Sequence, residues 1–303
     1  MEASSSQPKL ATSSGVGITL LLGILAAIIL PIIYVIINRM IPNIWFSAIT
    51  AALLGLGIGA AINFGIQIGK LRSKTIAFVV ATFCGLLGFY VQWVFFDTIA
   101  YSQNGFTFDL NSDDIKVLAS DFFFLFTHPN LLFTEISSLN EYGTFSIESS
   151  STVSGGLLWL IWFGEFVIIL GGLFFAVFRE GTIDTPYSEL NNAWFKKRKE
   201  LHFIPFVTDK EAFLQDLDNK NYAVLANDPA LQIAAEYAQV TIFESPNESI
   251  SYINVVNITN PSGKAKDRKV NKVARLHPIE DYQVQSIDST DAMDSTDSDQ
   301  SLA

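Results

Sequence analysis

Long apolar runs separated by short polar segments occupy most of the N-terminal part of the chain. Each run has about twenty residues or more, which is the length a helix needs to cross a hydrocarbon layer about 30 Å thick. Only the last of them contains a charged residue, Glu165. The pattern predicts four transmembrane helices, at Val16 to Ile37, Ile44 to Ile68, Thr75 to Phe96 and Ser154 to Phe178.

A shorter apolar segment lies between the third and fourth runs. Phe122 to Phe126 is followed by His128, Pro129 and then Leu131 to Phe133. About a dozen residues interrupted by proline are too few to span a membrane, so we expect one or two helices that lie on the membrane interface or cap the bundle. The approach to the fourth run is expected to be flexible, because it contains serines at 149, 150, 151 and 154.

The chain changes character after Phe178 and shows a mixed pattern of helices and strands. Two segments have helical patterns, and the second has proline at its start. Two runs rich in β-branched and aromatic residues flank a Ser-Pro-Asn turn and predict a hairpin, and a third strand follows. The helices are expected at Asp209 to Leu217 and Pro229 to Ala238, and the strands at Gln239 to Glu244, Ser249 to Thr259 and Lys269 to Leu276.

Composition agrees with a membrane class. Half of the residues are hydrophobic and only 16% are charged, whereas soluble domains have about 25% charged residues. The fold class predicted is therefore an all-α membrane bundle of four transmembrane helices with a small α+β C-terminal domain. The predicted parts are a polar N-terminus (1–15), three spans (16–96), an acidic loop (97–153), the fourth span (154–178), the α+β domain (179–286) and a disordered acidic tail (287–303).

Basic residues next to the spans predict the orientation of the chain, since cytoplasmic loops retain lysine and arginine. Lys70, Arg72 and Lys74 place the second connection in the cytoplasm, and Arg39 alone opposes this. Residues 97–153 carry one basic residue and eight acids, so they should lie outside. A bacterial inner (plasma) membrane protein with both termini cytoplasmic is expected, and its membrane-surface residues are the basic run Lys196, Lys197, Arg198 and Lys199.

Glu165 is the most informative single residue because it lies near the centre of a span. A central carboxylate costs about 2.5 to 3.5 kcal/mol on insertion scales, and the apolar residues of the same window outweigh that cost. Glu165 is therefore expected to face protein or a water-filled cavity, protonated or paired. It could act as a proton or cation site, although a structural hydrogen bond between helices is the commoner role of such a residue.

The depth of the other polar residues in the membrane, at a rise of about 1.5 Å per helical residue, indicates which of them can reach Glu165. Asn63 and Gln67 share one face of the second helix, and Gln92 lies on the third. Asn63 and Gln92 lie about 10 Å from the centres of their windows on opposite sides, so neither is expected to reach Glu165. Thr82 is closer in depth, at about 5 Å, and could accept or donate a hydrogen bond.

Glycines in the second window form two small-xxx-small pairs, Gly55 with Gly59 and Gly65 with Gly69. Glycine allows helix backbones to approach closely and pack by dispersion. Gly85 and Gly88 of the third window are expected to face them. The pattern is explained by packing within one bundle or by dimerisation, and the first is favoured; the oligomeric state stays open.

No known catalytic or metal-binding pattern is present. Cys84 is the only cysteine, and His128, His202 and His277 lack metal-ligand spacing. A nucleophile elbow, a phosphate-binding loop and a zinc-protease motif are all missing. We expect no cofactor, no metal and no enzymatic activity. The net charge of −11 also makes nucleic acid an unexpected partner.

Three segments resemble a family of uncharacterised bacterial four-span membrane proteins. They are Gly143-Thr-Phe-Ser146 before the last span, Trp162-Phe-Gly-Glu165 within it and Pro186-Tyr-Ser-Glu-Leu-Asn-Asn-Ala-Trp194 after it. Members of that family carry a Cys-x-x-Cys pair after the last span. Here Ser188 and Asn191 occupy the two positions, so this chain lacks any thiol chemistry of that pair. The resemblance implies the four spans and no particular activity.

Two functions are consistent with these features. The first is a non-enzymatic membrane anchor or scaffold that presents the C-terminal domain to another membrane or cytoplasmic protein or to the lipid surface. The basic residues near 196–199 and 264–275 would interact with anionic lipid, or they form a charged hairpin edge that prevents aggregation. The second is a small proton- or ion-coupled transporter or channel component that uses Glu165. The lipid bilayer is an expected partner in both cases.

Overall fold

The computed structural model describes residues 13–280 except 42, 101–111, 144, 148–150, 180–182, 184, 201 and 262–266. The predicted polar N-terminus, apart from its last residues, and the predicted acidic tail lie outside the described residues. The chain divides into two compact units, Met1–Asp184 and Thr185–Ala303, and each is described by itself.

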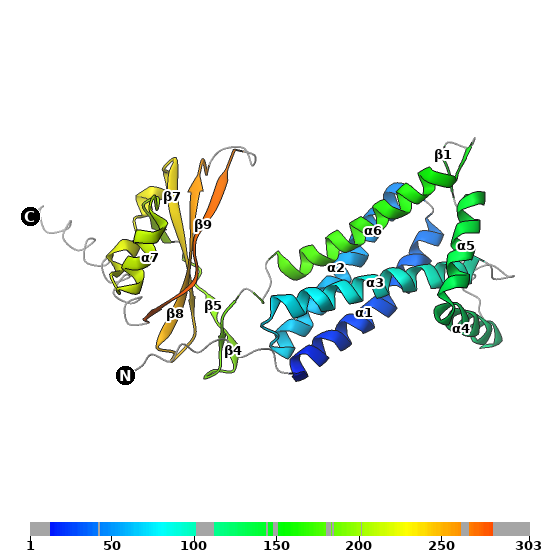
Figure 1. Ribbon diagram of the computed structural model, residues 1–303, viewed down its shortest axis with the longest axis horizontal. Helices are drawn as coiled ribbons and strands as arrows, with labels where there is room; N and C mark the ends of the chain where they lie inside the picture. The colour runs from blue at the N-terminus through cyan, green and yellow to red at the C-terminus, as the bar shows by residue number, and fades with distance from the viewer. Residues whose placement is uncertain are drawn as a thin grey trace, which may run out of the picture. The chain divides into compact units, whose positions relative to one another are not determined.

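Four long apolar helices form the first unit (Figure 1). Among the described residues, these four are long and apolar enough to cross a membrane, which confirms the four predicted helical runs. The third continues past its predicted end at Phe96 to Ala100. The helices are α1 (Ser13–Met40), α2 (Ile44–Gly69), α3 (Lys74–Ala100) and α6 (Gly155–Phe178).

The short connections between the first helices are formed by local capping. The Asn43 side chain accepts hydrogen bonds from the backbone N–H groups of Trp45 and Phe46, which satisfies two donors at the start of α2. Lys70 ends α2 in the left-handed conformation, with φ of 55°. These caps turn the chain back on itself, so α1, α2 and α3 follow one another as antiparallel neighbours.

The glycines of α2 bring two different helices against it. A Cβ atom at Gly55 would lie 2.0 Å from the Ile169 carbonyl oxygen of α6, and one at Gly59 would lie 2.5 Å from the Leu173 carbonyl oxygen. Near the other end of α2, Gly65 packs on the backbone of Thr19 and Gly69 on Gly15, both in α1. Both small-xxx-small pairs therefore serve packing within one bundle.

The glycines of α3 do not face the glycines of α2. A Cβ atom at Gly85 would meet the Leu170 and Leu173 side chains of α6, and one at Gly88 would meet Ile58 of α2. Closer contact between α3 and α1 occurs at Cys84, whose side chain is fully buried and whose Sγ lies 2.6 Å from a Cβ placed at Gly23. Gly88 thus faces α2 and Gly85 faces α6, while α3 packs mainly on α1.

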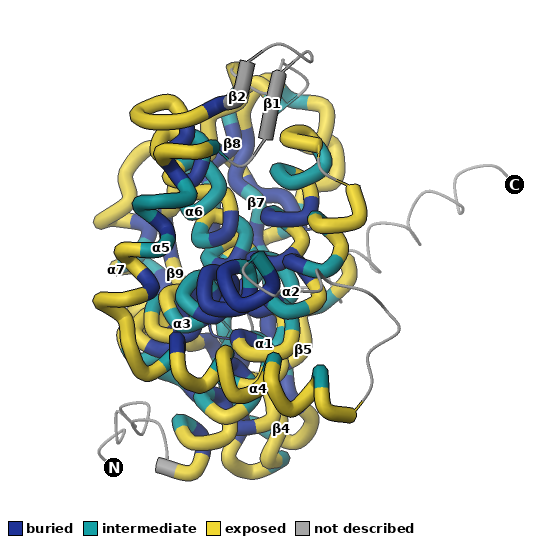
Figure 2. Tube along the Cα trace, turned by 90° about the vertical axis from the view of Figure 1, so that its right-hand side faces the viewer, coloured by how far each residue is buried: buried dark blue, intermediate teal, exposed yellow. Residues whose placement is uncertain are grey.

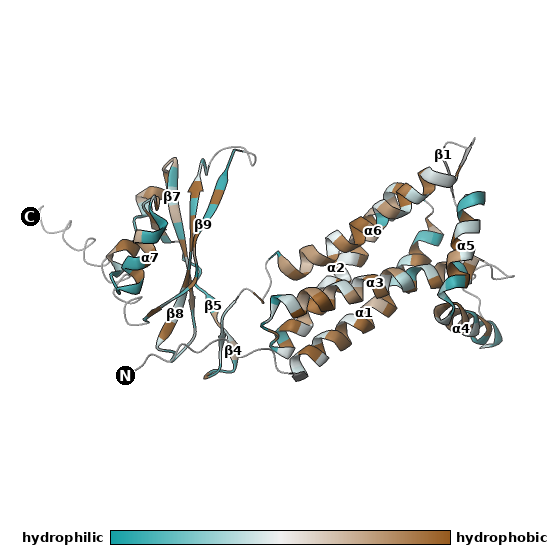
Figure 3. Cartoon of the chain, in the orientation of Figure 1, coloured by the Kyte–Doolittle hydropathy of each residue, from teal (hydrophilic) through white to brown (hydrophobic). Residues whose placement is uncertain are grey.

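The outward surface of the bundle is apolar. Hydrophobic residues recur along the length of α1, α2, α3 and α6 (Figure 3), and each of these helices has large hydrophobic side chains that are exposed. Leu21, Leu53 and Leu160 are each more than half exposed. Exposed leucines on every side are typical of helices surrounded by lipid rather than water. Buried and exposed segments alternate along the helices (Figure 2), and half of the apolar window of α2 is buried.

Two helices follow α3 and pack at one end of the bundle (Figure 1). They are α4 (Ser112–Thr127) and α5 (Pro129–Tyr142), with proline at the first position of α5. Leu125, Leu132 and Ile136 of these helices share a small core with residues of α3 and α6. One or two helices were expected in this segment, and the structure has two, which pack on α3 and α6.

The segment before α6 is more ordered than the serines predicted. Strands β1 (Phe145–Ile147) and β2 (Ser151–Val153) form an antiparallel hairpin in which Phe145 pairs with Val153. Ser151 therefore belongs to a strand, and Ser154 immediately precedes α6. Ser149 and Ser150 lie outside the described residues. Because Val153 joins the core shared by α3, α5 and α6, burial of this residue holds the hairpin against the bundle.

The second unit is built on a five-stranded antiparallel sheet. Its order is β5, β7, β8, β9, and β6 also pairs with β7. A separate two-stranded ladder joins β3 to β4. The elements are β3 (Tyr187–Ser188), β4 (Ala193–Trp194), β5 (Lys196–Lys197), β6 (His202–Ile204), α7 (Lys210–Asp218), η2 (Tyr222–Leu225), η3 (Pro229–Ile233), β7 (Glu236–Glu244), β8 (Ile250–Thr259) and β9 (Lys269–Glu280).

One face of this sheet carries the core of the second unit. Ile242 of β7 pairs with Ile253 of β8, and both are buried beneath Phe213 and Leu217 of α7. The alternation of buried and exposed residues along β8 is the period expected of a half-buried strand. The predicted hairpin and third strand are confirmed, as is the helix predicted near residues 209–217, which observably spans Lys210–Asp218.

Two predictions in this unit were partly wrong. The helix expected from Pro229 to Ala238 is a short 3-10 turn, and Ala238 is a fully buried strand residue paired with Asn257. Burial in the sheet core overrides the helical preference of alanine. Strand β9 also continues past Leu276, which has φ of 47° beside an irregularity in the register. Pro278 is tolerated because β9 is at the edge of the sheet.

His277 of β9 is the residue through which the stability of this unit is expected to depend on pH. Its Nε2 lies 3.6 Å from Asp218 Oδ1 of α7. Burial lowers the pKa of His277 below its ordinary value of 6.5, and the Asp218 carboxylate opposes this only in part. The folded unit therefore resists protonation of an imidazole that the unfolded chain protonates readily.

We predict that replacing Gly55 with alanine destabilises the bundle by about 1 to 3 kcal/mol, because the new methyl group would overlap the α6 backbone. Unfolding of the purified protein in detergent, followed by circular dichroism, measures the change. Gly171→Ala is the matched control, since nothing lies within 4 Å of a Cβ at Gly171. Equal stability of the two variants would contradict the packing described here.

A second prediction concerns acid sensitivity of the second unit. A histidine whose pKa is lower in the folded than in the unfolded state contributes to stability. That contribution is fully present above about pH 6.5 and is lost as the pH falls below this value. Amide hydrogen exchange of β9 in the full-length protein should show less protection at pH 5.5 than at pH 7.5, after correction for intrinsic rates. His277→Gln should reduce this difference. An unchanged difference in that variant would assign the effect to other groups.

Candidate functional site

Three helices of the bundle meet at the carboxyl group of Glu165. Tyr34 of α1 donates a hydrogen bond from its hydroxyl to Glu165 Oε1. Gln92 of α3 donates from Nε2 to the same oxygen at 3.0 Å. Tyr34 and Gln92 are 7% and 5% exposed, so both donors are held inside the bundle. A single carboxyl oxygen of α6 thus joins α1 and α3.

The other polar atoms of this cluster are less well satisfied. Glu165 Oε2 makes no hydrogen bond to any residue that the structure describes, and Gln92 Oε1 is buried without a partner there. Both donors to Oε1 are neutral, and no described cation pairs with the carboxyl group. Oε2 is therefore the atom at which Glu165 could carry a proton or accept a donor from a bound molecule.

The depth comparison wrongly excluded Gln92. Helix α3 extends to Ala100, which moves its midpoint toward Gln92 and leaves that residue only about 7.5 Å beyond it. Glu165 lies about 2 Å beyond the midpoint of α6 in the same direction. The remaining separation of about 5 Å is within the reach of two long side chains. The error came from ending the third helix at Phe96.

Tyr34, and not Thr82, is a hydrogen-bond partner of Glu165. The Thr82 hydroxyl donates to the Phe78 carbonyl of its own helix at 2.8 Å and is exposed, so it does not reach Glu165. Tyr34 was missed among the polar candidates because tyrosine is readily counted with the apolar residues of a span. It is the only tyrosine in the first apolar window. Its long side chain carries a hydroxyl that can donate a hydrogen bond to a carboxylate near the centre of a span.

Asn63 and Gln67 of α2 do not belong to the Glu165 cluster. Asn63 Oδ1 is buried and has no hydrogen-bond partner in the described part of the chain, and Gln67 is exposed. Asp97 is a further buried polar residue, 1% exposed, with no partner for Oδ1 among the described residues. It had been assigned to the acidic loop, but it belongs to α3, which is longer than predicted.

A second polar contact that sequence reasoning missed joins α1 to α2. Asn38 Nδ2 donates to Thr50 Oγ1 at 3.0 Å, and Thr50 also lies within hydrogen-bonding distance of Asn38 Oδ1. Asn38 lies just beyond the first predicted window. Like the Glu165 cluster, this contact pairs polar groups between helices inside the bundle and has the geometry of a structural link.

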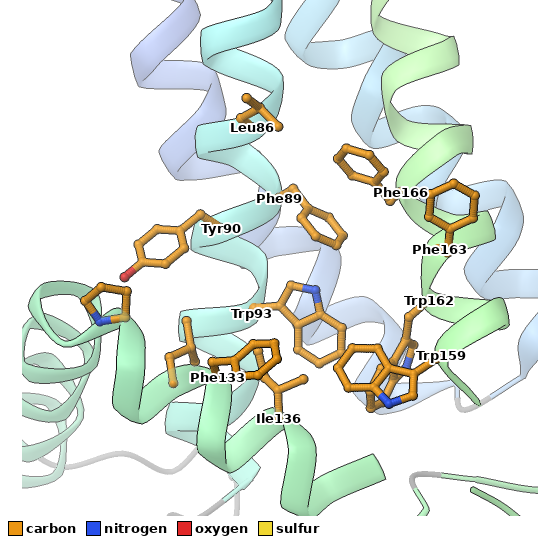
Figure 4. Close-up of a pocket in the computed structure, with 12 residues that line it drawn as sticks. Leu86, Phe89, Tyr90, Trp93, Phe133, Ile136, Trp159, Trp162, Phe163 and Phe166 are labelled. Carbon is orange, nitrogen blue, oxygen red and sulfur yellow. The ribbon is translucent and has the colours of Figure 1, made fainter. Parts of the chain in front are cut away.

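An aromatic groove lies near the capping helices, and no sequence pattern had suggested it (Figure 4). It has a volume of about 470 Å³ and is walled by α3, α5 and α6. Trp93 of α3 and Trp162 of α6 meet edge to face inside it, with ring centres 4.7 Å apart. The lining residues are Leu86, Phe89, Tyr90, Trp93, Pro129, Leu132, Phe133, Ile136, Trp159, Trp162, Phe163 and Phe166.

The side chains of the predicted basic run, residues 196–199, are not all exposed. Lys196, Lys197 and Lys199 are exposed, but Arg198 pairs with Glu244 of β7 at 2.8 Å. In the second basic segment, Lys269 and Lys272 of β9 are exposed. Lys264 and Lys266 lie outside the described residues. Free lysines are thus present on both β5 and β9 of the sheet.

Ser188 and Asn191, which lie at the β3–β4 turn, are hydrogen-bonded. Ser188 Oγ accepts from the Asn191 backbone N–H at 2.9 Å and donates to the Glu248 carboxylate. Asn191 Nδ2 donates to Ser245 Oγ at 2.8 Å. These bonds tie the β3–β4 turn to the turn between β7 and β8, which is a structural role that needs no thiol.

Histidines are separated in the fold as they are in the sequence. His128 precedes α5 in the first unit, whereas His202 and His277 belong to strands of the second. His202 Nε2 lies 2.5 Å from the Leu225 carbonyl oxygen, which is a contact within the core. Among the described residues no group of three histidine, cysteine or acidic side chains is placed to hold a metal ion.

Comparisons with protein-family models, curated proteins and solved structures find no match for this chain. The geometry of the bundle and of the second unit is therefore the basis on which its function is inferred.

A double-mutant cycle should detect the link between α1 and α6. Tyr34→Phe and Glu165→Met each remove one side of the hydrogen bond, and we predict a coupling energy of about 0.6 kcal/mol, with about 1.7 kcal/mol as the upper end for such pairs. Unfolding of the detergent-solubilised protein measures it. Thr82→Val paired with Glu165→Met is the control and should show no coupling. Zero coupling in the Tyr34 cycle would exclude the bond.

Proposed function

We propose that this protein is a non-enzymatic integral membrane protein whose helical bundle anchors and positions the second unit for binding to another protein. The observation that carries the proposal is the division of the chain into two compact units of opposite character. One unit has four apolar helices with apolar outer surfaces. The other has its own core and a polar, charged surface.

The proposed orientation places both termini in the cytoplasm of a bacterium and residues 97–153 outside its plasma membrane. Lys70, Arg72 and Lys74 lie at the connection of α2 to α3, and exposed lysines follow α6 in the chain. Asp113 and Asp114 begin α4, at the opposite end of the bundle from Lys70. This distribution of charge follows the preference for positive residues in cytoplasmic loops.

The surface best suited to a partner is the edge of the sheet at β9. Residues 269–272 of this strand are all exposed, and β9 is the last strand in the sheet order, so one side of its backbone is unpaired by any described strand. An open strand edge can accept an added strand of another protein, and its lysines disfavour pairing with any strand that does not carry complementary acidic residues. Acidic peptide segments fit the charge of this edge.

Site-specific photocrosslinking in native membranes tests the proposal. A crosslinking residue at Val270, which is 52% exposed on β9, should capture a defined protein, whereas one at Tyr142, 81% exposed in the first unit, should not capture the same protein. Reversing the charge of Lys269 and Lys272 should reduce capture at Val270. Equal products at both positions, or none at Val270, would contradict the proposed function.

A second candidate function is proton- or ion-coupled transport. It is favoured by one observation, the unpartnered Oε2 of Glu165 beside two neutral donors. An intramembrane carboxyl group of this kind is a candidate proton site. Under this alternative, reconstituted vesicles would show pH-dependent flux that Glu165→Gln abolishes. Under the first proposal, the same variant would retain folding and partner capture, and the vesicles would show no flux above protein-free controls.

A further inference from the structure

The turn that joins β3 to β4, residues 187–194, carries an exposed leucine beside two aromatic rings. Leu190, within the turn, is 67% exposed. Tyr187 and Trp194 pair across the two strands, edge to face, with ring centres 5.2 Å apart. The Tyr187 hydroxyl donates to Asn192 Oδ1 at 2.6 Å. Tyrosine and tryptophan have apolar rings with a polar group, and together with an exposed apolar side chain they are the residues that gather at a membrane–water interface.

Side-chain hydrogen bonds hold this β3–β4 turn in place. Asn191 Nδ2 donates to Ser245 Oγ at 2.8 Å, and Ser188 Oγ donates to the Glu248 carboxylate. Both contacts join the turn to the chain between β7 and β8. Leu190 is therefore displayed on a fixed part of the second unit. A surface that is already ordered loses less conformational entropy when it binds.

The length of the connecting chain keeps the β3–β4 turn close to one end of the bundle. Ile183 is 6% exposed and belongs to the core of the four long helices, and Tyr187 follows it by four residues. Four residues of extended chain reach about 14 Å at most. Helix α6 ends at Phe178, and the Arg179 guanidinium lies 4.6 Å from the centre of the Phe175 ring. An arginine at the end of a span lies at the level of the lipid headgroups, so the turn begins near that level.

Exposed lysines follow the β3–β4 turn directly. The three lysines of residues 196–199 form no ion pair with an acid that the structure describes, and lysines near a membrane are attracted to anionic headgroups. Glu189 and Glu200 are exposed acids of the same segment, so three lysines against two acids leave an excess of one positive charge. Charge therefore contributes to attachment, and the apolar side chain of Leu190 is its main source.

We propose that the β3–β4 turn inserts into the lipid headgroup region on the cytoplasmic side, with Leu190 toward the acyl chains and the Tyr187–Trp194 pair at the interface. The exposed lysines of residues 196–199 then bind the phosphates of anionic lipids. Strands β5, which follows the turn, and β9 are at opposite ends of the sheet order, so this attachment leaves the β9 edge open. The inference rests on the proposed membrane anchor but not on the partner of β9.

The full-length protein in lipid nanodiscs of phosphatidylcholine and phosphatidylglycerol tests the proposal. An NBD fluorophore on Ala193→Cys, an exposed position in β4, should emit at shorter wavelength than NBD on Ile233→Cys and should be quenched more by nitroxide-labelled lipids. Ile233 is 92% exposed on the same unit and should report water. The parent chain, whose only cysteine is buried, gives the labelling background. NBD on Leu160→Cys, 65% exposed on α6, reports whether the bundle is in the bilayer.

The apolar side chain and the lysines are tested separately with the same Ala193 label. Leu190→Ser should remove the quenching of this label. Val270→Ser, which alters a 52% exposed residue of β9, is the matched control and should leave it unchanged. Replacing the three lysines of residues 196–199 with glutamine should reduce the quenching only in nanodiscs that contain phosphatidylglycerol, because neutral headgroups do not attract the lysines.

Three results would contradict the proposal, and they differ in what else they contradict. Equal quenching at positions 193 and 233, with the Leu160 label quenched, would overturn the inference and leave the membrane anchor intact. An unquenched Leu160 label would overturn the membrane location and the inference together. A label at Ala193 that is shielded in native membranes but not in nanodiscs would assign the turn to a protein partner and overturn lipid as its occupant.

Discussion

Backbone contact along α2 is the constraint on which the rest of the bundle depends. Gly55 and Gly59 allow the α6 backbone to approach from one side, and Gly65 and Gly69 allow α1 to approach near the other end. Side chains at these positions would push both neighbours outward. Because α1 and α6 are held against the same helix, Tyr34 and Glu165 come within hydrogen-bonding distance although they are 131 residues apart in the chain.

The same arrangement explains why a groove exists where it does. Helix α3 packs mainly on α1, so it approaches α6 closely only around Gly85. Toward the capping helices, the large side chains of Phe89, Trp93 and Trp162 occupy the interface. The helices therefore pack closely where glycines meet a neighbouring helix, and a groove remains where large aromatic side chains meet. The polar cluster at Glu165 lies between these two regions along α6.

Much of this architecture was predictable from hydrophobic patterns, because helix length and strand alternation follow directly from where apolar residues recur. The four long helices, the two capping helices and the central hairpin of the second unit were found in this way. The predictions that were wrong depend on a few residues at the ends of helices and strands. Four additional residues at the end of α3 brought Gln92 to Glu165 and Asp97 into the helix, and buried pairing converted Ala238 from helix to strand.

The contacts between elements were not predictable from one sequence. A small-xxx-small pair indicates close packing, but it does not say which helix is the neighbour, and α2 uses its two pairs for two different neighbours. The role of Tyr34 depends on the rotation of α1 relative to α6, which hydropathy does not encode. The groove likewise arises from side chains on three separate elements. Such features become visible only when the helices are placed in three dimensions.

The pairing of α6 with α2 also has a consequence for biosynthesis. Helices α1, α2 and α3 are translated well before α6, and the segment between α3 and α6 must be completed first. When α6 is inserted, Tyr34 and Gln92 are already available to receive its carboxyl group. The Gly65–Gly69 face of α2 has its neighbour α1 from the start, whereas the Gly55–Gly59 face has no neighbour until α6 is made. The order of the helices along the chain thus leaves one seam of the first three helices open until residues 155–178 follow them.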